Sequence, residues 1–363
     1  MKEIKLNLKK NSYDILVGNN LLKALGATLI KSGIGKNAYI ITNAFLKKKY
    51  GNKLAFSLLN AGLSIKFKLV PDSEKSKSIQ QAYSIIRELA KYDKKKRIFI
   101  IAFGGGVIGD LSGFVASIYK RGLPYVQVPS TLLAQVDSAI GGKTAVDLNE
   151  GKNLVGAFYQ PKLVFSDVSL LKTLNPRQIK SGLAEVVKYG MIKDRGLFLY
   201  IEKNYKKILS LKEKKLEFIV AACSKIKAEV VRRDEREEKG IRTILNFGHS
   251  IGHAIEAASG YKGYNHGEAV AIGMLVACDI SKSLGMVNEK VCLRLEKLIK
   301  QLGLPTAIKG IKIKKLFTAF YRDKKFIGAK NRLVLLKNIG KTKIVSGVPL
   351  KVIKKAVASR MAN

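Results

Sequence analysis

The chain has 363 residues, 47% of them hydrophobic and 26% charged, so it can bury a large core and is long enough for two domains. The longest apolar stretch, residues 269–277, is shorter than the roughly 20 residues that a membrane-spanning helix needs. The first residues lack the apolar core and cleavage site of a signal peptide, so we predict a cytoplasmic protein.

A formal net charge of +40 raises the question of nucleic-acid binding, because Lys and Arg neutralise phosphates. The lysines are scattered in short runs such as 94–97, 212–215 and 312–315, without interleaved aromatic residues or a known nucleic-acid motif. We therefore predict solvated faces and no specific nucleic-acid partner. The same positive field would attract an anionic substrate.

The first half of the chain alternates strand-like and helical segments. Apolar runs at 38–42, 98–103 and 125–128 are each followed by a polar or helical stretch. This order is typical of βαβ units and a mostly parallel sheet. We predict an α/β, Rossmann-like domain over residues 1–176.

A glycine-rich turn follows the buried strand pattern that ends at Phe103, in the segment Gly104-Gly105-Gly106-Val107-Ile108-Gly109-Asp110. Strand, glycine turn and helix form a phosphate cradle, because glycines allow close approach and the helix amides favour negative charge. A tight turn that only packs the helix on the sheet is the alternative. No acidic residue stands about 20 positions downstream to hold a ribose, so we look instead to Glu74 and Lys77 upstream.

From about Pro176 the apolar period becomes helical. The predicted helices cover 179–192, 215–231, 244–258 and 268–284. We predict an all-α C-terminal domain over residues 177–363.

One of these helices carries a carboxylate suited to a metal. A catalytic zinc takes about three His or carboxylate ligands and keeps one open position. Glu185 and Lys188 share a face of an otherwise apolar helix, where an uncompensated charge would be costly. The alternative for this pair is a simple ion pair within the helix.

All three histidines, His249, His253 and His266, fall within one short segment. His249 and His253 share a helix face, and His266 returns from the following loop. Ser250 follows His249, so the segment is not the H-E-x-x-H motif of metalloproteases. A lone histidine is usually structural, but this cluster predicts a metal or acid–base role.

The three cysteines, Cys223, Cys278 and Cys292, are widely spaced and include no C-x-x-C pair. Such spacing indicates neither a disulfide framework nor a cysteine zinc site. We predict buried free thiols.

Seven segments, in order over nearly the whole chain, resemble the 3-dehydroquinate synthase family of sugar phosphate cyclases. They are GGGVIGD (104–110), YKRG (119–122), VPSTLLAQVDS (128–138), GGKT (141–144), GKN (151–153), AEVVK (184–188) and NFGHSIGHAIE (246–256). Each segment alone is weakly specific, whereas the ordered set is highly specific.

The resemblance implies an NAD-binding N-terminal domain and a helical metal-binding domain. Glu185, His249 and His266 would hold zinc, or cobalt as a substitute, and His253 would move protons. The implied cofactor contacts are Glu74, Lys77, Gly104, Gly105, Gly106, Val107, Asp110, Ser130, Thr131, Lys143, Lys152, Leu170 and Thr173.

The resemblance also implies which residues hold the carboxylate, hydroxyls and phosphate of the substrate. These are Asp137, Lys143, Asn153, Lys188, Lys227, Arg242 and Asn246. Arg121 would reach the site of a neighbouring subunit, which implies a homodimer. Glu238 is a further proton-transfer candidate, and either Lys324 or Lys325 would contact substrate. One departure stands after Thr42, where the family usually has an Asp and, two residues on, an Asn; here these are Asn43 and Phe45.

The implied reaction converts 3-deoxy-D-arabino-heptulosonate 7-phosphate to 3-dehydroquinate and phosphate, in the shikimate pathway to chorismate and the aromatic amino acids. It would proceed by transient oxidation with NAD, phosphate elimination, re-reduction and aldol closure. The nearest alternatives are another sugar phosphate cyclase or a metal-dependent polyol dehydrogenase. An alternative of another class is a polyanion-binding protein that keeps the fold without the activity.

Overall fold

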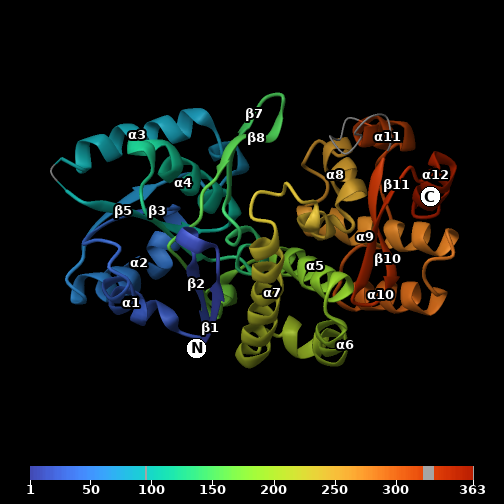
Figure 1. Cartoon of the computed structure of the whole chain (residues 1–363), viewed down its shortest axis with the longest axis horizontal. Helices are drawn as coiled ribbons and strands as arrows, with labels where there is room; N and C mark the ends of the chain where they lie inside the picture. The colour runs from blue at the N-terminus through green and yellow to red at the C-terminus, as the bar shows by residue number, and fades with distance from the viewer. Residues whose placement is uncertain (95, 322–330, 363) are drawn as a thin grey trace. The chain divides into compact units, whose positions relative to one another are not determined.

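The computed structural model describes residues 1–94, 96–321 and 331–362 (Figure 1). The chain divides into two compact units. Unit 1 consists of Met1–Leu174 and Leu216–Arg236, and unit 2 of Asn175–Lys215 and Glu237–Asn363. The first change of unit lies next to the boundary predicted at residue 176, but the chain then returns to unit 1 through most of one helix, α7 (Glu213–Arg233).

Unit 1 is built on a seven-stranded sheet of order β1-β2-β9-β6-β5-β3-β4. Its strands are β1 (Lys2–Leu6), β2 (Tyr13–Gly18), β3 (Asn37–Thr42), β4 (Ser64–Leu69), β5 (Ile98–Gly104), β6 (Tyr125–Pro129) and β9 (Leu163–Asp167). Only the β1–β2 pair is antiparallel. The Rossmann-like α/β prediction is therefore confirmed.

Helices cover both faces of this sheet, since alternate side chains of each strand point to opposite faces. On β5, Ile101 and Phe103 join one core cluster, while Ile100 and Ala102 join the other. The first cluster includes residues of α1 (Leu25–Lys31) and α2 (Ala44–Asn60), and the second includes residues of α3 (Ile79–Tyr92) and α4 (Gly106–Ile118). A separate antiparallel hairpin, β7 (Lys143–Leu148) and β8 (Gly151–Phe158), completes unit 1.

Unit 2 is helical, as predicted, and is arranged around α9. Its helices are α5 (Pro176–Ile192), α6 (Arg195–Leu209), α8 (His249–Ala258), α9 (His266–Ser283), α10 (Glu289–Gln301), α11 (Ile313–Tyr321) and α12 (Leu350–Ala358). Helix α9 packs against α5, α8, α10 and α12. One hairpin, β10 (Arg332–Asn338) and β11 (Lys341–Ser346), was not anticipated. None of the helices in the described ranges is both long and apolar enough to cross a membrane.

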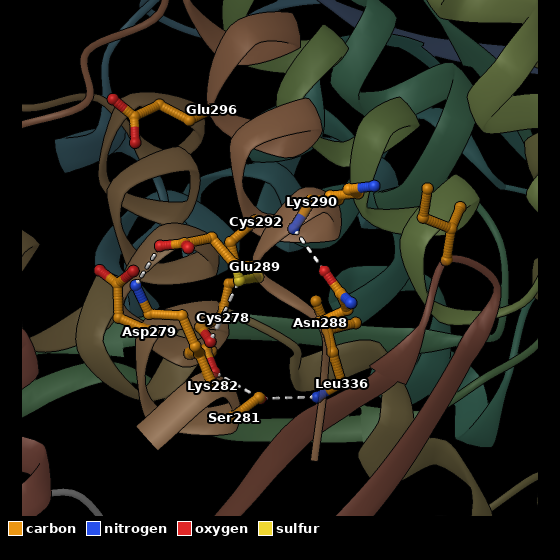
Figure 2. The surroundings of a disulfide bond; sticks show 12 residues. Cys278, Asp279, Ser281, Lys282, Asn288, Glu289, Lys290, Cys292, Glu296 and Leu336 are labelled. Atoms are coloured by element: carbon orange, nitrogen blue, oxygen red, sulfur yellow. Dashed lines mark hydrogen bonds and ion pairs between the residues drawn. A yellow bond between two sulfur atoms is a disulfide. The ribbon is translucent and has the colours of Figure 1, made fainter. Parts of the chain in front are cut away.

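A disulfide between Cys278 and Cys292 joins α9 to α10 (Figure 2). Their Cα atoms are 5.8 Å apart, within the usual range for a disulfide. The prediction of free thiols is therefore wrong for this pair. The physical reason is the helical hairpin: the cysteines lie seven residues before and seven after Gly285, at the turn, so they face each other. Cys223, buried on α7, keeps its thiol.

This disulfide predicts a simple thiol count. In denaturant without reductant, one of the three cysteines should react with a thiol reagent, and all three should react after reduction. Reduction should also lower the thermal midpoint, because a cross-link that closes a loop of this length contributes about 3 kcal/mol. As the control, Cys223→Ser should leave no reactive thiol before reduction and two after it. Three reactive thiols in the unreduced wild type would contradict the structure.

Candidate functional site

One carboxylate and two imidazoles converge inside unit 2. His266 Nε2 lies 3.4 Å and His249 Nε2 lies 3.6 Å from the same oxygen, Glu185 Oε1. Two ligand atoms on a tetrahedral zinc, each bonded at 2.0–2.1 Å, are about 3.3–3.4 Å apart. The three donors therefore have the chemistry and spacing to hold a divalent metal.

Glu185 sits at the middle of α5, where the surrounding side chains are apolar and fully covered. The side chain is 0% exposed, and one turn on Lys188 is 1% exposed and pairs with its Oε2. The ion pair considered as the alternative thus exists. It does not compete with a metal role, because Oε1 is the oxygen that faces the imidazoles.

The start of α9 is fixed directly against α5. A Cβ atom on Gly267 would lie 2.2 Å from the Ser181 carbonyl oxygen, so only glycine permits this approach. The Gly267 amide donates to Ser181 Oγ at 3.0 Å. Ser181 precedes Glu185 by one helical turn, so this contact sets His266 beside Glu185.

The first turn of α9 is also capped. Asn265 and Glu268 form a capping box, in which Asn265 Oδ1 accepts from the Glu268 amide at 2.9 Å. Arg177 holds the Glu268 carboxylate with both Nε and Nη2, at 2.6 and 2.7 Å. The backbone that carries His266 is therefore held from two sides.

His249 begins α8 and is positioned by its own neighbours. Its Nδ1 lies 3.2 Å from the Phe247 carbonyl oxygen, a contact that places the proton on Nδ1 and turns Nε2 toward Glu185. A Cβ on Gly273 of α9 would lie 2.0 Å from the Gly248 carbonyl oxygen. Helix α8 is thus packed on α9 as closely as the backbones allow.

His266 lies between two carboxylates, Glu185 and Glu256. Burial disfavours its charge, but hydrogen bonds to Glu185 and Glu256 outweigh that effect and raise the pKa of His266 to about 10. Without a metal, the ring is thus protonated at neutral pH. The two carboxylates create a position that favours positive charge, which a divalent ion can supply in place of the proton.

His253 is exposed and stands apart from the Glu185, His249 and His266 donor group. Its ring centroid lies 5.4 Å from that of His249 and 6.3 Å from that of His266. This places a third imidazole beside the cluster, accessible to solvent.

The glycine turn of unit 1 lies at the carboxyl end of β5 and the start of α4. A Cβ on Gly104 would lie 2.6 Å from Ile108 Cβ, which supports the packing interpretation at that position. Gly105 is the N-cap of α4, and among the described residues no side chain caps that helix start. The first amides of α4 are therefore suited to an anion such as a pyrophosphate.

Four of the predicted cofactor residues, together with Asn153, make three contacts, one of which involves Asp110 of α4. Lys77 Nζ lies 2.5 Å from Asp110 Oδ2 and also contacts Asn153 Oδ1. Burial raises the pKa of the Asp110 carboxyl, and Lys77 opposes that shift. Lys152 Nζ lies 3.1 Å from Glu74 Oε1. Asn153, expected to contact the substrate, shares Lys77 with Asp110, which is expected to contact the cofactor.

The remaining predicted residues of unit 1 occupy several local settings. Asp137 lies in a π-helical turn (Ala134–Ser138), and its backbone oxygen accepts from Lys227 Nζ of α7 at 2.7 Å. Such turns are frequent at functional sites. Thr173 Oγ1 lies 2.9 Å from the Tyr50 hydroxyl. The rest lie at the β5 turn (Gly106, Val107), after β6 (Ser130, Thr131), at the start of β7 (Lys143) and after β9 (Leu170).

Arg121 is exposed at a turn with an uncommon backbone. Lys120 and Arg121 have positive φ values of 48° and 62°, and Gly122 has a φ of 128°. Consecutive left-handed residues other than glycine are strained and concentrate at functional positions. Lys120 Nζ anchors the turn at 2.5 Å from Asp93 Oδ2.

In unit 2, a 3-10 helix (Ile241–Asn246) carries Arg242, which is 2% exposed, and Asn246. Glu238 is exposed. Lys324 and Lys325 lie outside the described residues. Asn43, at the departure from the family pattern, caps α2 by accepting from the Leu46 amide at 2.8 Å. Glu256 was missed, although its place seven residues after His249 puts it on the same helix face.

Models of known families match most of the chain. The 3-dehydroquinate synthase N-terminal model matches residues 67–181, and the C-terminal model matches residues 182–326. The chain is 44% identical to a 3-dehydroquinate synthase of Thermoanaerobacter pseudethanolicus, over 95% of this chain and 97% of that one. This chain belongs to the 3-dehydroquinate synthase family. It is also 45% identical to a 3-dehydroquinate synthase of Dictyoglomus turgidum, over 96% and 95% of the two chains.

Solved structures of other cyclases share the fold. A 2-epi-5-epi-valiolone synthase of Streptomyces hygroscopicus, with NAD+ and Zn2+ bound, has a TM-score of 0.88, 26% identity and coverage of 97% and 98%. A 2-deoxy-scyllo-inosose synthase, complexed with carbaglucose-6-phosphate, NAD+ and Co2+, has a TM-score of 0.84, 25% identity and coverage of 99% and 100%. An iron-containing alcohol dehydrogenase of Thermotoga maritima, at 17% identity and a TM-score of 0.68 over 96% and 98% of the two chains, shares the fold alone.

The buried Glu185–Lys188 pair predicts a stability effect in the metal-free protein. Lys188→Met should lower the free energy of unfolding by about 3 kcal/mol, because it leaves a buried carboxylate without its lysine. We expect a loss at the low end of the range for removing one partner of a buried ion pair, since protonated His266 still faces Glu185. Urea unfolding followed by circular dichroism measures the loss. The double variant Glu185→Gln, Lys188→Met should recover most of it, and equal midpoints for Lys188→Met and wild type would contradict the prediction.

Proposed function

We propose that this chain is a 3-dehydroquinate synthase, a phosphate-eliminating lyase that converts 3-deoxy-D-arabino-heptulosonate 7-phosphate to 3-dehydroquinate. The observation that carries the proposal is the convergence of Glu185, His249 and His266 at 3.4–3.6 Å in a member of this family. Curated relatives of 42–45% identity over most of the chain bear this name. Two cyclases of the same fold were crystallised with NAD+ and Zn2+ or Co2+.

In this proposal Glu185, His249 and His266 hold a zinc or cobalt ion, and the glycine turn with Glu74, Lys77, Asp110 and Lys152 holds NAD. When bound, NAD supplies a reversible hydride acceptor and the metal supplies a Lewis acid for a ring hydroxyl. The remaining cofactor residues are those expected from the sequence. The start of α4, which no described side chain caps, supports the pyrophosphate position because its amides favour negative charge.

The chain's own residues bind the substrate and move its protons. Lys143, Lys227 and Arg242 supply cations for the carboxylate and phosphate, and Asp137, Asn153, Lys188 and Asn246 complete the expected contacts. His253, exposed beside His249, can carry a proton between the substrate and water. Its neighbours Glu185 and His249 are buried, so the cluster combines a covered metal position with one accessible proton carrier.

A metal-dependent polyol dehydrogenase is the alternative that the shared fold allows. It would accumulate reduced NAD, whereas the cyclase returns its hydride within each turnover. A glycerol dehydrogenase and an iron-containing alcohol dehydrogenase of known structure are 14% and 17% identical, which supports the fold and not the activity. Another cyclase would differ in substrate, and the 42–45% identity to 3-dehydroquinate synthases favours the seven-carbon substrate.

The deciding experiment measures phosphate release from 3-deoxy-D-arabino-heptulosonate 7-phosphate, with NAD present in catalytic amount, while absorbance reports reduced cofactor. We expect metal-dependent release without accumulation of reduced NAD. His249→Ala should lose both bound zinc and turnover, because it removes a ligand. His253→Ala is the matched control: it should keep zinc but lose about 10²–10⁴-fold in rate, as expected for a lost proton carrier. No phosphate release by the metal-loaded wild type would refute the function.

We propose also that the chain acts as a homodimer in which Arg121 serves the partner's site. Its exposure on a strained turn supports this role. Arg121→Ala and His249→Ala should each be inactive alone. Unfolding and refolding them as an equal mixture should restore about one quarter of wild-type activity, because half of the dimers are mixed and each has one intact site. Recovery of no activity would place Arg121 in its own subunit's site, and wild-type activity of Arg121→Ala alone would place it outside catalysis.

A further inference from the structure

Glu256 faces the side of His266 that is turned away from Glu185. His249, His253 and Glu256 lie at i, i+4 and i+7 on α8, so their side chains share one face. Glu256 Oε2 lies 3.4 Å from His266 Nδ1, while His266 Nε2 lies 3.4 Å from Glu185 Oε1. The imidazole is therefore held between two carboxylates, one at each nitrogen.

We propose that Glu256 is a positioning residue for the metal, acting through His266. The inference rests on the proposed metal role of Glu185, His249 and His266. The Glu256 carboxylate accepts a hydrogen bond from Nδ1–H of His266, which leaves the lone pair on Nε2, the nitrogen that faces Glu185. A carboxylate in this position also makes the imidazole a stronger donor.

The two histidines of the cluster differ in this outer contact. His249 Nδ1 faces a backbone carbonyl, Phe247 O, at 3.2 Å, which fixes its tautomer without adding charge. His266 Nδ1 faces a carboxylate that is only 13% exposed, which fixes the tautomer and adds a negative charge. Glu256 therefore adjusts the strength of one ligand, whereas Phe247 only orients the other.

The backbone of His266 does not depend on Glu256. The capping box of Asn265 and Glu268 and the contact of Gly267 with Ser181 hold the start of α9 separately. Removing the Glu256 carboxylate should therefore alter the orientation and basicity of the ring without unfolding the helix. This separation makes the role testable by metal affinity.

Glu256 could instead be a metal ligand itself. His253, Glu256 and His266 also form a group with donor atoms within 4.8 Å of one another. A metal there would use His266 Nδ1, leaving Nε2 for the first group, so both positions filled would give two ions per chain. The positioning role predicts one ion per chain, and stoichiometry distinguishes the two.

The experiment measures zinc affinity of the purified full chain by competition with a chromophoric chelator, together with zinc per chain. Glu256→Ala should bind zinc about 10–100-fold more weakly, the usual effect of losing such an outer partner. Glu256→Gln keeps an acceptor but not the charge, so its loss should be smaller. Glu256→Asp should recover part of the affinity. Glu289→Gln, an exposed carboxyl on α10, is the matched control and should leave affinity unchanged.

A second readout excludes a general structural effect. The visible spectrum of the Co2+-loaded protein should shift in Glu256→Gln, because the donor strength of His266 changes, while the helical circular dichroism of the metal-free variant stays that of wild type. Wild-type affinity in Glu256→Ala, with one ion per chain, would overturn the positioning role alone. Two ions in wild type and one in Glu256→Ala would overturn it in favour of a second site. Failure of wild type to bind zinc would overturn the proposed metal site itself.

Discussion

The close packing of α9 against α5 and α8 is the constraint on which the cluster of Glu185, His249 and His266 depends. At Gly267 and Gly273 the backbones approach so closely that a Cβ atom would lie 2.2 and 2.0 Å from a carbonyl oxygen of the facing segment. Real Cβ atoms do not tolerate such contacts, so a larger residue at either position must move the helix. A shift of one ångström would destroy the 3.4 and 3.6 Å separations that suit a shared ion. Two glycines thus set the geometry of a site in which neither takes part chemically.

The cost of burying a charged carboxylate is the second constraint. In each unit a lysine forms an ion pair with the buried carboxylate and offsets this cost. In unit 2, Lys188 compensates Glu185 in a setting where an isolated charge would cost several kcal/mol. In unit 1, Lys77 pairs with Asp110, whose pKa burial still raises. The difference lies in what else faces each carboxylate. Glu185 also faces two imidazoles, which can exchange a proton for a metal. Asp110 faces Lys77, whose Nζ also contacts the side-chain amide oxygen of Asn153.

Much of this could be predicted from local pattern. The sequence segments that form β3, β5 and β6 are short and apolar, and helical segments follow them along the chain. Both features can be recognised from neighbouring residues alone. The histidine cluster could be predicted because His249 and His253 are one helical turn apart. Glu185 could be predicted because an uncompensated charge in an apolar helix is costly. Lys77 with Asn153 and His266 with Glu256 could not be paired in this way. Those contacts depend on how separate elements pack, and periodicity within one element carries no information about that.

The disulfide shows the same limit, since it depends on a helical hairpin. Cys278 and Cys292 look unrelated until the turn at Gly285 is known to reverse the chain between them. Counting cysteines then misleads, because the odd residue, Cys223, belongs to a helix of the other unit. The assignment of most of α7 to unit 1 could not be predicted from the sequence either. The apolar stripe of this helix predicts that it is buried, but it does not indicate which unit it packs against.

These contacts together restrain α9 along its whole length. Its first turn is held by Ser181 and the capping box, and its far half by the disulfide to α10. Near the same end, Arg360 joins Asp279 of α9 to Glu296 of α10, at 2.7 and 2.8 Å, and is itself only 14% exposed. A helix fixed at both ends loses little further freedom when a ligand on it engages an ion. His266 is therefore held in advance at the proposed metal position, and binding energy need not be spent on ordering the helix that carries it.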